Sequence, residues 1–308
     1  MNYQHTLILY RTITPLHVGC GQAVGVVDLP VIRERATGYP FIPGSGIRGS
    51  LRDIFENKDQ DLTNTLFGPE ADPGADEEDK HAGCVAIHDA RLLFYPVRAD
   101  RKVFLWITCP LVLERFNRDR KAFEISAYAN FDRTGLASEV DEKKFIGQAD
   151  LSNVLHLEEF GFERDTAATA VATNLQTFAG NFNLGIDDLA ARTVLVSNRS
   201  FYHFVNYATI LMQHNTLTSA KTVKDGALFS VESLPPETIF YGMFGATDER
   251  KAERKAANAP ANGKLPQKKV MDKFKTTLLG GNGATTKYLH LGGKESTGLG
   301  LTQLTWVS

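Results

Sequence analysis

Two arginines and a cluster of small residues lie together in the stretch GYPFIPGSGIRGSLRDIF, residues 38–55. The small residues are Gly44, Ser45, Gly46 and Gly49. Arg48 and Arg52 are four positions apart, so a helix places them on one side. Glycines let a ligand approach the backbone, and the free N–H groups at a helix start attract anions. The stretch predicts a seat for the phosphates of a polyanion; the alternative is a capped helix with two solvated arginines.

Asp28 and His17 are a second pair of residues that could do chemistry. They flank a loop with glycines at positions 19, 21 and 25, and this loop leads into the predicted phosphate seat. Asp28 has apolar neighbours, so its carboxylate must be exposed, paired or functional. A lone aspartate and a lone histidine are usually structural or solvated. Their position beside the glycine-rich loop is what makes them catalytic candidates.

A second glycine cluster, GGKESTGLG at residues 292–300, also has the composition of a phosphate-binding loop. Its candidate contacts are Gly292, Gly293, Lys294 and Gly298. The cluster lacks the G-x-x-x-x-G-K-[ST] order of a P-loop, so we do not expect ATPase chemistry. The chain also lacks the H-E-x-x-H spacing of a zinc site and the G-x-S-x-G motif of a serine hydrolase.

The charge of the chain is small but unevenly distributed. The net charge of −2 argues against a protein that binds nucleic acid by itself. Residues 53–80 hold ten acidic and two basic side chains, so the remainder is net positive and can form a basic groove. The most acidic part, about residues 70–82, predicts a mobile surface loop.

The sequence predicts a cytoplasmic protein. No apolar run approaches the length of a membrane span, and the first residues lack the pattern of a secretory signal. The three cysteines are odd in number and widely spaced, which is typical of reduced thiols rather than a disulfide framework.

The apolar patterning predicts an α+β fold. Strands are expected at 6–14, 84–97, 102–109 and the C-terminal end, all in one antiparallel sheet. Ile47, Leu51, Ile54 and Phe55 recur on a helical period and predict a helix that also contains Arg48. This helix and a second helix over 201–212, with Ser200 as N-cap, should pack on one face of this sheet. The weak periodicity between 117 and 185 predicts irregular surface structure, and 248–275 a surface helix and linker.

A basic hairpin is predicted near residues 215–236. Asp225-Gly226 lies between two β-prone arms, which is a strong signal for a hairpin turn. Lys221 and Lys224 make it basic, and Phe229 adds apolar bulk. The hairpin is either an ordinary surface feature or a finger that lies against RNA and separates its bases.

Several motifs together resemble the repeat-associated mysterious protein (RAMP) superfamily of CRISPR systems. The similar stretches are GYPFIPGSGIRGSLR, LHLGGKESTGLG and DARLLFYPVRADRKVFLWITCPLVLERF. LHVGCGQAVGVVDLPVIRE and KTVKDGALFSVESLPPETIF are similar to the backbone-subunit family of the type III-B (Cmr) effector complex. The resemblance covers most of the chain, except about 70–82 and 248–275.

The resemblance implies a single domain, 1–308, with a modified ferredoxin-like (RRM-like) palm, inserted fingers and a thumb hairpin at about 215–236. It also implies a filament of several copies along one guide RNA, with other effector subunits as partners and no membrane contact. Each thumb would flip a nucleotide, and complementary target RNA would be cut at regular intervals. Gly44–Arg52 and the 292–300 loop would lie together on guide phosphates, with Lys221 and Lys224 as further RNA contacts.

The resemblance also implies roles for individual residues. Asp28 matches the cleaving aspartate of the family, His17 a nearby histidine, and Glu232 falls in the thumb region where the family has an acidic residue. Arg48 replaces the family's lysine, which keeps the charge and adds a bidentate fork for phosphate.

The implied reaction is attack of the RNA 2′-OH on the adjacent phosphate. Asp28 either accepts the 2′-OH proton or holds a divalent cation, Mg²⁺ being the expected ion. A carboxylate is a weak base near neutral pH, which favours the metal-holding role. Two alternatives are a scaffold subunit that binds guide RNA and cuts nothing, and an endonuclease that processes guide RNA through His17.

Overall fold

The computed structural model describes residues 3–22, 25–70, 80–126, 130–137, 139–182, 184–215, 218–222, 224, 228–250 and 264–307. These residues form a mixed α+β fold, as the sequence predicts. Within these ranges no helix is both long enough and apolar enough to span a membrane. That residues 1–308 form one domain stays a prediction.

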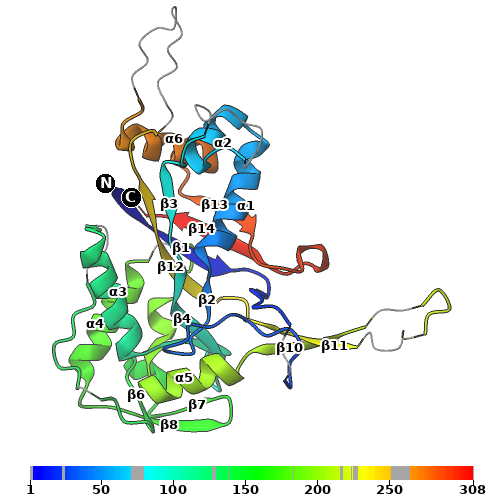
Figure 1. Ribbon diagram of the computed structural model, residues 1–308. Helices are drawn as coiled ribbons and strands as arrows, with labels where there is room; N and C mark the ends of the chain where they lie inside the picture. Colours follow the sequence, from blue (N-terminus) through cyan, green and yellow to red (C-terminus); the bar gives the residue numbers. More distant parts are fainter. Residues whose placement is uncertain are drawn as a thin grey trace, which may run out of the picture.

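The centre of the molecule is a nine-stranded sheet (Figure 1). Its main path runs β13 (Thr286–His290), β14 (Leu301–Trp306), β1 (Gln4–Thr12), β12 (Ile239–Ala246), β4 (Ala90–Arg98), β5 (Phe104–Thr108) and β9 (Thr193–Leu195). β2 (Phe41–Ile42) pairs with β4, and β3 (Val85–Ile87) pairs with β12. β5 and β9 are parallel, and the other named pairs of this sheet are antiparallel.

The sheet confirms the predicted antiparallel core, and the structure adds that strands from both ends of the chain are neighbours in it. β1 pairs with β14 on one side and with β12 on the other. The predicted strand 84–97 is divided into β3 and β4, with His88 and Asp89 between them. β4 also continues through Pro96, which lies opposite Trp106 of β5.

The helices lie at two ends of the sheet (Figure 1). α1 (Gly44–Glu56), α2 (Gln60–Phe67) and α6 (Gln267–Leu279) gather at one end, and the ring of Phe55 stacks on Phe274 of α6 at 4.9 Å. Ile47, Leu51 and Phe55 are the buried apolar stripe that the sequence predicts for α1. The sequence predicts α1 and the second helix on one face; the structure places that helix, α5 (Asn198–Tyr207), at the other end.

The region 117–185 is more ordered than its sequence predicts. α3 (Pro110–Ala122) extends into this region, and α4 (Thr169–Gly180) buries Val171, Leu175 and Phe178 on one side. β6 (Lys144–Phe145), β8 (Phe160–Arg164) and β7 (Val154–Leu157) form a small separate sheet. The prediction of irregular structure is wrong here, because alanines and threonines dilute the apolar stripe of α4 without breaking its spacing.

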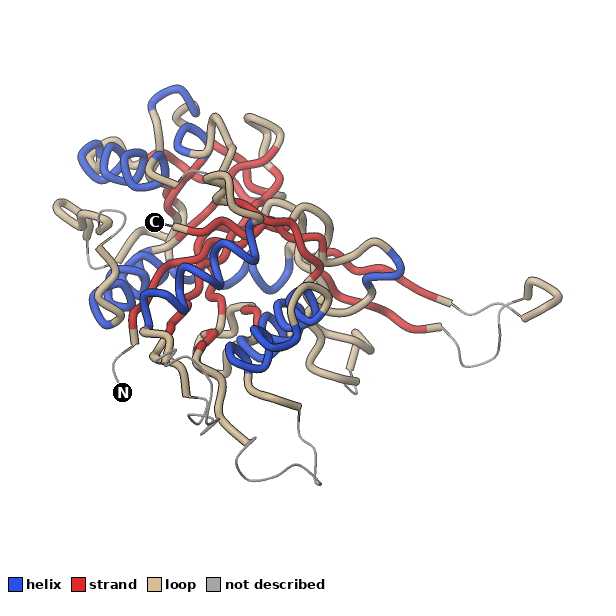
Figure 2. The backbone as a smooth tube through the Cα atoms, turned by 90° about the horizontal axis from the view of Figure 1, so that it is seen from above, coloured by secondary structure: helices blue, strands red, loops and turns tan. Residues whose placement is uncertain are grey.

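A two-stranded ribbon projects from the body of the molecule (Figures 1 and 2). It consists of β10 (Ile210–His214) and β11 (Phe229–Ser233), which are antiparallel. The predicted helix 201–212 is therefore too long and starts too late. α5 ends at Tyr207, and its N-cap is Ser197, whose side chain accepts a hydrogen bond from the Ser200 N–H at 3.0 Å.

The far end of the ribbon is described only in part. Residues 218–222 form a turn in which the Thr218 N–H donates to the Thr222 carbonyl at 2.8 Å, and Lys221 has a φ of 59°. The predicted Asp225-Gly226 turn lies outside the described residues. Residues 71–79 of the predicted acidic loop and 251–263 of the predicted linker also lie outside them.

Candidate active site

Asp28 is an exposed carboxylate that Ser230, near the start of β11, holds in place. Its Oδ2 accepts hydrogen bonds from the Ser230 N–H and the Ser230 hydroxyl, both at 2.8 Å. The Asp28 N–H donates to Ser230 Oγ at 3.0 Å. The bond from the Ser230 N–H has the larger effect and the bond from its hydroxyl the smaller one. Both hold the pKa of Asp28 below its ordinary value, because they stabilise the charged form. The carboxylate is therefore ionised at neutral pH and is a weak base.

The residues after Asp28 run alongside β11. The Leu29 N–H donates to the Ser230 carbonyl, and the Glu232 N–H donates to the Leu29 carbonyl, both at 3.0 Å. Leu29 is parallel to Val231 in this bridge. Asp28 is thus tied in register to the base of the projecting ribbon.

Glu232 is buried and serves as a brace for this pairing. One carboxylate oxygen, Oε1, lies 2.6 Å from the Arg33 guanidinium, and Oε2 accepts the Val31 N–H at 2.9 Å. Arg33 also donates to the Val205 carbonyl of α5 at 2.9 Å. With both of its oxygens engaged, Glu232 has the surroundings of a structural residue, and the accessory catalytic role stays a prediction.

His17 is also buried and lies between β11 and the 292–300 loop. Its Nδ1–H donates to the Glu232 backbone carbonyl at 2.6 Å, and its own carbonyl accepts the Gly293 N–H at 2.8 Å. A β-carbon on Gly292, where φ is 78°, would lie 2.3 Å from the His17 carbonyl oxygen, so this position requires glycine. His17 and Asp28 thus both contact β11, but the hydrogen bonds of His17 are to backbone groups.

The 292–300 loop places a cation at the base of the ribbon. Lys294 Nζ lies 4.8 Å from the centre of the Phe229 ring, which is a cation–π distance. Phe229 precedes Ser230 in β11, and its other ring contact is a stack on His214 of β10 at 5.4 Å. Gly298 has a φ of 84° and open space around its α-carbon. The predicted loop thus contacts β11, the strand to which Asp28 is bonded.

The arginines of α1 bind the end of α2. Arg48 donates to the Phe67 carbonyl and its guanidinium lies 5.7 Å from the Phe67 ring centre, while Arg52 donates to the Gly68 carbonyl at 2.8 Å. These contacts satisfy carbonyls at a helix end that would otherwise lack partners. Arg48 and Arg52 of the predicted phosphate seat therefore have a structural role in the free chain. Their contact with phosphate stays a prediction.

The start of α1 is partly occupied by the protein itself. The Gly44 N–H donates to Asp89 Oδ1 at 2.7 Å, and a β-carbon on Gly44 would lie 2.4 Å from the Ile87 carbonyl oxygen. Gly46 and Gly49 differ from Gly44: both are exposed, and an added β-carbon would meet nothing within 4 Å. Ser45 is exposed beside them. That this face lies beside the 292–300 loop stays a prediction.

Lys221 and Lys224 are exposed and belong to the segment that connects β10 to β11, whereas Asp28 is bonded to Ser230 within β11. The structure therefore divides the predicted cations between the ribbon end and its base. The lysines' contact with RNA stays a prediction.

The donor set around Asp28 fits a divalent cation only in a limited way. Over the ranges that the structure describes, no three His, Cys, Asp or Glu side chains are placed to hold a metal ion together. Both carboxylate oxygens of Glu232 have protein partners, and His17 is buried, which leaves the exposed Oδ1 of Asp28 as the candidate ligand. Mg²⁺ is often bound by one or two carboxylates together with water and substrate phosphates, and this site matches that pattern.

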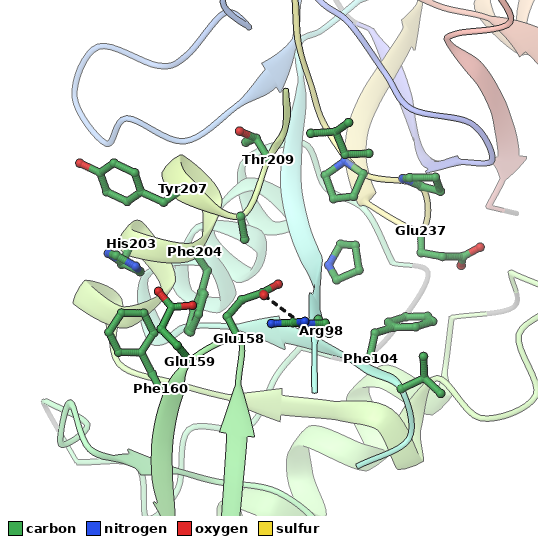
Figure 3. A pocket seen from close by; sticks show the side chains of 16 residues that line it. Arg98, Phe104, Glu158, Glu159, Phe160, His203, Phe204, Tyr207, Thr209 and Glu237 are labelled. Atoms are coloured by element: carbon green, nitrogen blue, oxygen red, sulfur yellow. Dashed lines mark hydrogen bonds and ion pairs between the residues drawn. The ribbon is translucent and has the colours of Figure 1, made fainter. Parts of the chain in front are cut away.

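A separate pocket lies where α5 leads into β10, at the base of the ribbon (Figure 3). Its volume is about 520 Å³, and His203, Phe204 and Tyr207 of α5 form one wall. Three glutamates line it, and Arg98 pairs with one of them, Glu158, at 3.1 Å. The excess of carboxylates makes this pocket unsuitable for phosphate, so we assign no part of the candidate active site to it.

Sequence reasoning missed Ser230 and Arg33. Ser230 lies in FSVES, where nothing distinguishes it from other serines of a strand, and its partner is 202 positions away. Arg33 follows the Asp28 loop closely, but its pairing with Glu232 spans 199 positions. Neither contact has a local signal in the sequence.

The fold and the site together define a class of protein. It is an α+β protein with a fixed carboxylate at the base of a projecting ribbon, next to a glycine-rich loop. The chain belongs to the RAMP superfamily, whose family model matches residues 9–303. The resemblance that the sequence motifs predict is thereby confirmed.

Known relatives extend over the whole chain. It is 29% identical over 308 residues to the CRISPR system Cmr endoribonuclease Cmr4 of Pyrococcus furiosus, covering 97% of this chain and 94% of the relative. The crystal structure of oligomeric Cmr4 from Pyrococcus furiosus matches with a TM-score of 0.68 at 24% identity, covering 100% of both chains. A chain from the cryo-EM structure of the type III-B Cmr-beta complex bound to cognate target RNA matches with a TM-score of 0.72 at 21% identity, covering 98% and 96%.

Proposed function

We propose that this chain is the backbone subunit of a type III-B CRISPR effector complex. Several copies would bind one guide RNA as a filament, together with other subunits in the cytoplasm, and would cleave complementary target RNA at regular intervals. The full-length similarity to the Pyrococcus furiosus endoribonuclease supports this function. The single observation that carries it is the ionised carboxylate of Asp28, exposed and fixed at the base of the ribbon.

In this proposal each part of the fold has a task. The nine-stranded sheet is the ferredoxin-like palm, the region with α3, α4 and the small sheet is the inserted fingers, and the ribbon is the thumb. A thumb that separates two stacked nucleotides frees the RNA backbone for the in-line geometry that a stacked A-form strand forbids. Asp28 lies where the thumb leaves the palm, so the carboxylate would face the distorted nucleotide.

The proposed reaction is a transesterification within the RNA. The 2′-oxygen forms a bond to the adjacent phosphorus, the bond from phosphorus to the 5′-oxygen breaks, the 2′-OH proton passes to water, and the leaving oxygen takes a proton from water. The products are a 2′,3′-cyclic phosphate and a 5′-OH. Asp28 is too weak a base to remove the proton efficiently at neutral pH, so its Oδ1 would act by holding Mg²⁺. When bound, this ion would offset the charge that develops on the phosphate.

The proposed function is tested by reconstituting the complex with a guide RNA and supplying two substrates separately. Complementary target RNA is expected to be cut at regular intervals, with cyclic-phosphate and 5′-OH ends, and EDTA is expected to stop the reaction. Precursor guide RNA is expected to remain intact. Cleavage of the precursor alone would indicate a processing endonuclease, cleavage of neither would indicate a scaffold, and 5′-phosphate ends would rule out 2′-OH attack.

Guide binding is expected to depend on Gly46 and Gly49. Glycine within a helix costs roughly 0.5–1 kcal/mol relative to alanine, and no internal contact requires glycine at either position. The double substitution Gly46→Ala, Gly49→Ala is therefore expected to raise the melting temperature. It is also expected to weaken guide binding, because the added methyl groups keep a phosphate backbone at a distance.

The matched control for this prediction is Thr173→Ala, Thr177→Ala on α4, two exposed helical positions that are four residues apart. It should also stabilise the helix, and it should leave guide affinity unchanged. Binding is measured with guides of unrelated sequence, since contacts to phosphate carry no sequence information. A glycine double variant that binds guides as the native chain does would remove this face of α1 from the interface.

A further inference from the structure

The described residues directly before Asp28 lie at the surface. Gly25, Val26 and Asp28 are exposed, and the Val26 side chain is 97% exposed. A carboxylate on such a loop would sample many orientations unless another element fixed it. Catalytic groups must be held within a fraction of an ångström of their working position, so whatever fixes Asp28 contributes to the reaction.

Ser230 is the residue that does so. Its hydroxyl both donates to Oδ2 of Asp28 and accepts the Asp28 N–H, and its own N–H donates to the same Oδ2. These three bonds fix the rotation of the aspartate side chain and determine which oxygen is occupied. Among the described residues, no other side chain hydrogen-bonds to the Asp28 carboxylate.

We propose that Ser230 is a positioning residue of the cleavage reaction, which acts by fixing Oδ2 of Asp28 so that Oδ1 stays available at the RNA. The proposal rests on the function proposed above. Ser230 makes no contact with the reacting atoms in this account. It acts through Asp28, and because it belongs to β11, it links the orientation of the carboxylate to the ribbon.

Neighbouring candidates fit this task less well. Glu232 accepts the Val31 N–H and pairs with Arg33, and His17 donates to the Glu232 carbonyl. Each of them shapes the strand pairing, but none reaches the carboxylate. Gln213 lies directly opposite Ser230 in β10, but it is exposed, whereas Ser230 is partly buried, and it makes no hydrogen bond to Asp28.

The test is Ser230→Ala in the reconstituted complex, with single-turnover cleavage and target affinity measured separately. We expect the cleavage rate to fall by roughly 10- to 100-fold, because the bond from the Ser230 N–H remains while the hydroxyl is lost. Affinity for a target with a 2′-deoxy nucleotide at the cut site should stay within about twofold. Ser230→Thr keeps the hydroxyl and suits a strand, so it should restore most of the rate.

Two controls separate positioning from damage to the ribbon. Gln213→Ala changes the opposite residue of the same strand pair and should leave the rate unchanged. Adding Ser230→Ala to an Asp28→Asn chain should cause no further loss, because a residue that acts through Asp28 has nothing left to position. Equal losses in Ser230→Ala and Gln213→Ala would overturn the proposal, and so would an additive loss in the double variant.

The outcomes also distinguish a failure of this proposal from a failure of the proposed function on which it rests. If the native complex does not cleave target RNA, the proposed function fails. If Asp28→Asn silences the complex while Ser230→Ala cleaves at the native rate, the positioning role alone fails.

Discussion

Replacing Asp28 with asparagine is expected to lower target cleavage by about 10²- to 10⁴-fold and to leave target binding unchanged. Asparagine keeps the size of the side chain and an oxygen that can accept the Ser230 hydrogen bonds, so the geometry is preserved and the charge is lost. Without a negative charge the side chain neither holds a cation well nor accepts a proton. The measurement is single-turnover cleavage of labelled target RNA, beside a filter-binding assay on the same preparation.

Asp132 provides a matched control for this prediction. It is an exposed aspartate whose Oδ1 accepts the Thr134 N–H at 2.9 Å and the Thr134 hydroxyl at 2.7 Å, and these bonds lower its pKa as they do for Asp28. Asp132→Asn should therefore cleave at the native rate. Undiminished cleavage by the Asp28 variant would move the chemistry to another residue.

Replacing Arg33 with methionine is expected to lower the free energy of unfolding by about 3 kcal/mol. The Glu232 side chain is 8% exposed, so removing its cationic partner leaves a buried carboxylate without charge compensation. Arg33 also ties the end of α5 to this region through the Val205 carbonyl, and that bond is lost as well. Chemical denaturation of the isolated chain, followed by tryptophan fluorescence, measures the change.

The exposed pair Arg199–Glu142 is the comparison for Arg33. Its side chains are 80% and 55% exposed, so Arg199→Met should change the free energy of unfolding by less than about 1 kcal/mol. If Arg33→Met proves no more destabilising than Arg199→Met, Glu232 is not a structural brace. Glu232 would then return as a candidate for the chemistry itself.

Local patterns in the sequence predicted those elements whose side chains repeat on one clear period. The stripe of Ile47, Leu51 and Phe55 predicted α1, and the β-rich segments at both ends predicted the central sheet. The helix over 201–212 was extended too far because Leu211 and Met212 also fit helical spacing. Pairing with β11, which lies far along the chain, makes this segment a strand, and no local pattern contains that information.

The candidate site shows the same division between local and distant information. Asp28 and the 292–300 loop stand out by composition and by resemblance, and the structure places both beside β11. The partners of Arg48 and Arg52 could not be predicted, because the carbonyls that they bind become neighbours only when α2 folds back on α1. Ser230 was missed for a similar reason, since a serine gains its role here only from the strand register.

The central claim is that each copy of this chain cuts the target with its own Asp28. The most direct measurement is to assemble complexes from mixtures of native and Asp28→Asn chains and to follow every cleavage product of one target. The account predicts that each product falls in proportion to the fraction of variant chain, while the positions of the cuts and target binding do not change. Products that persist when every chain carries the substitution would contradict it.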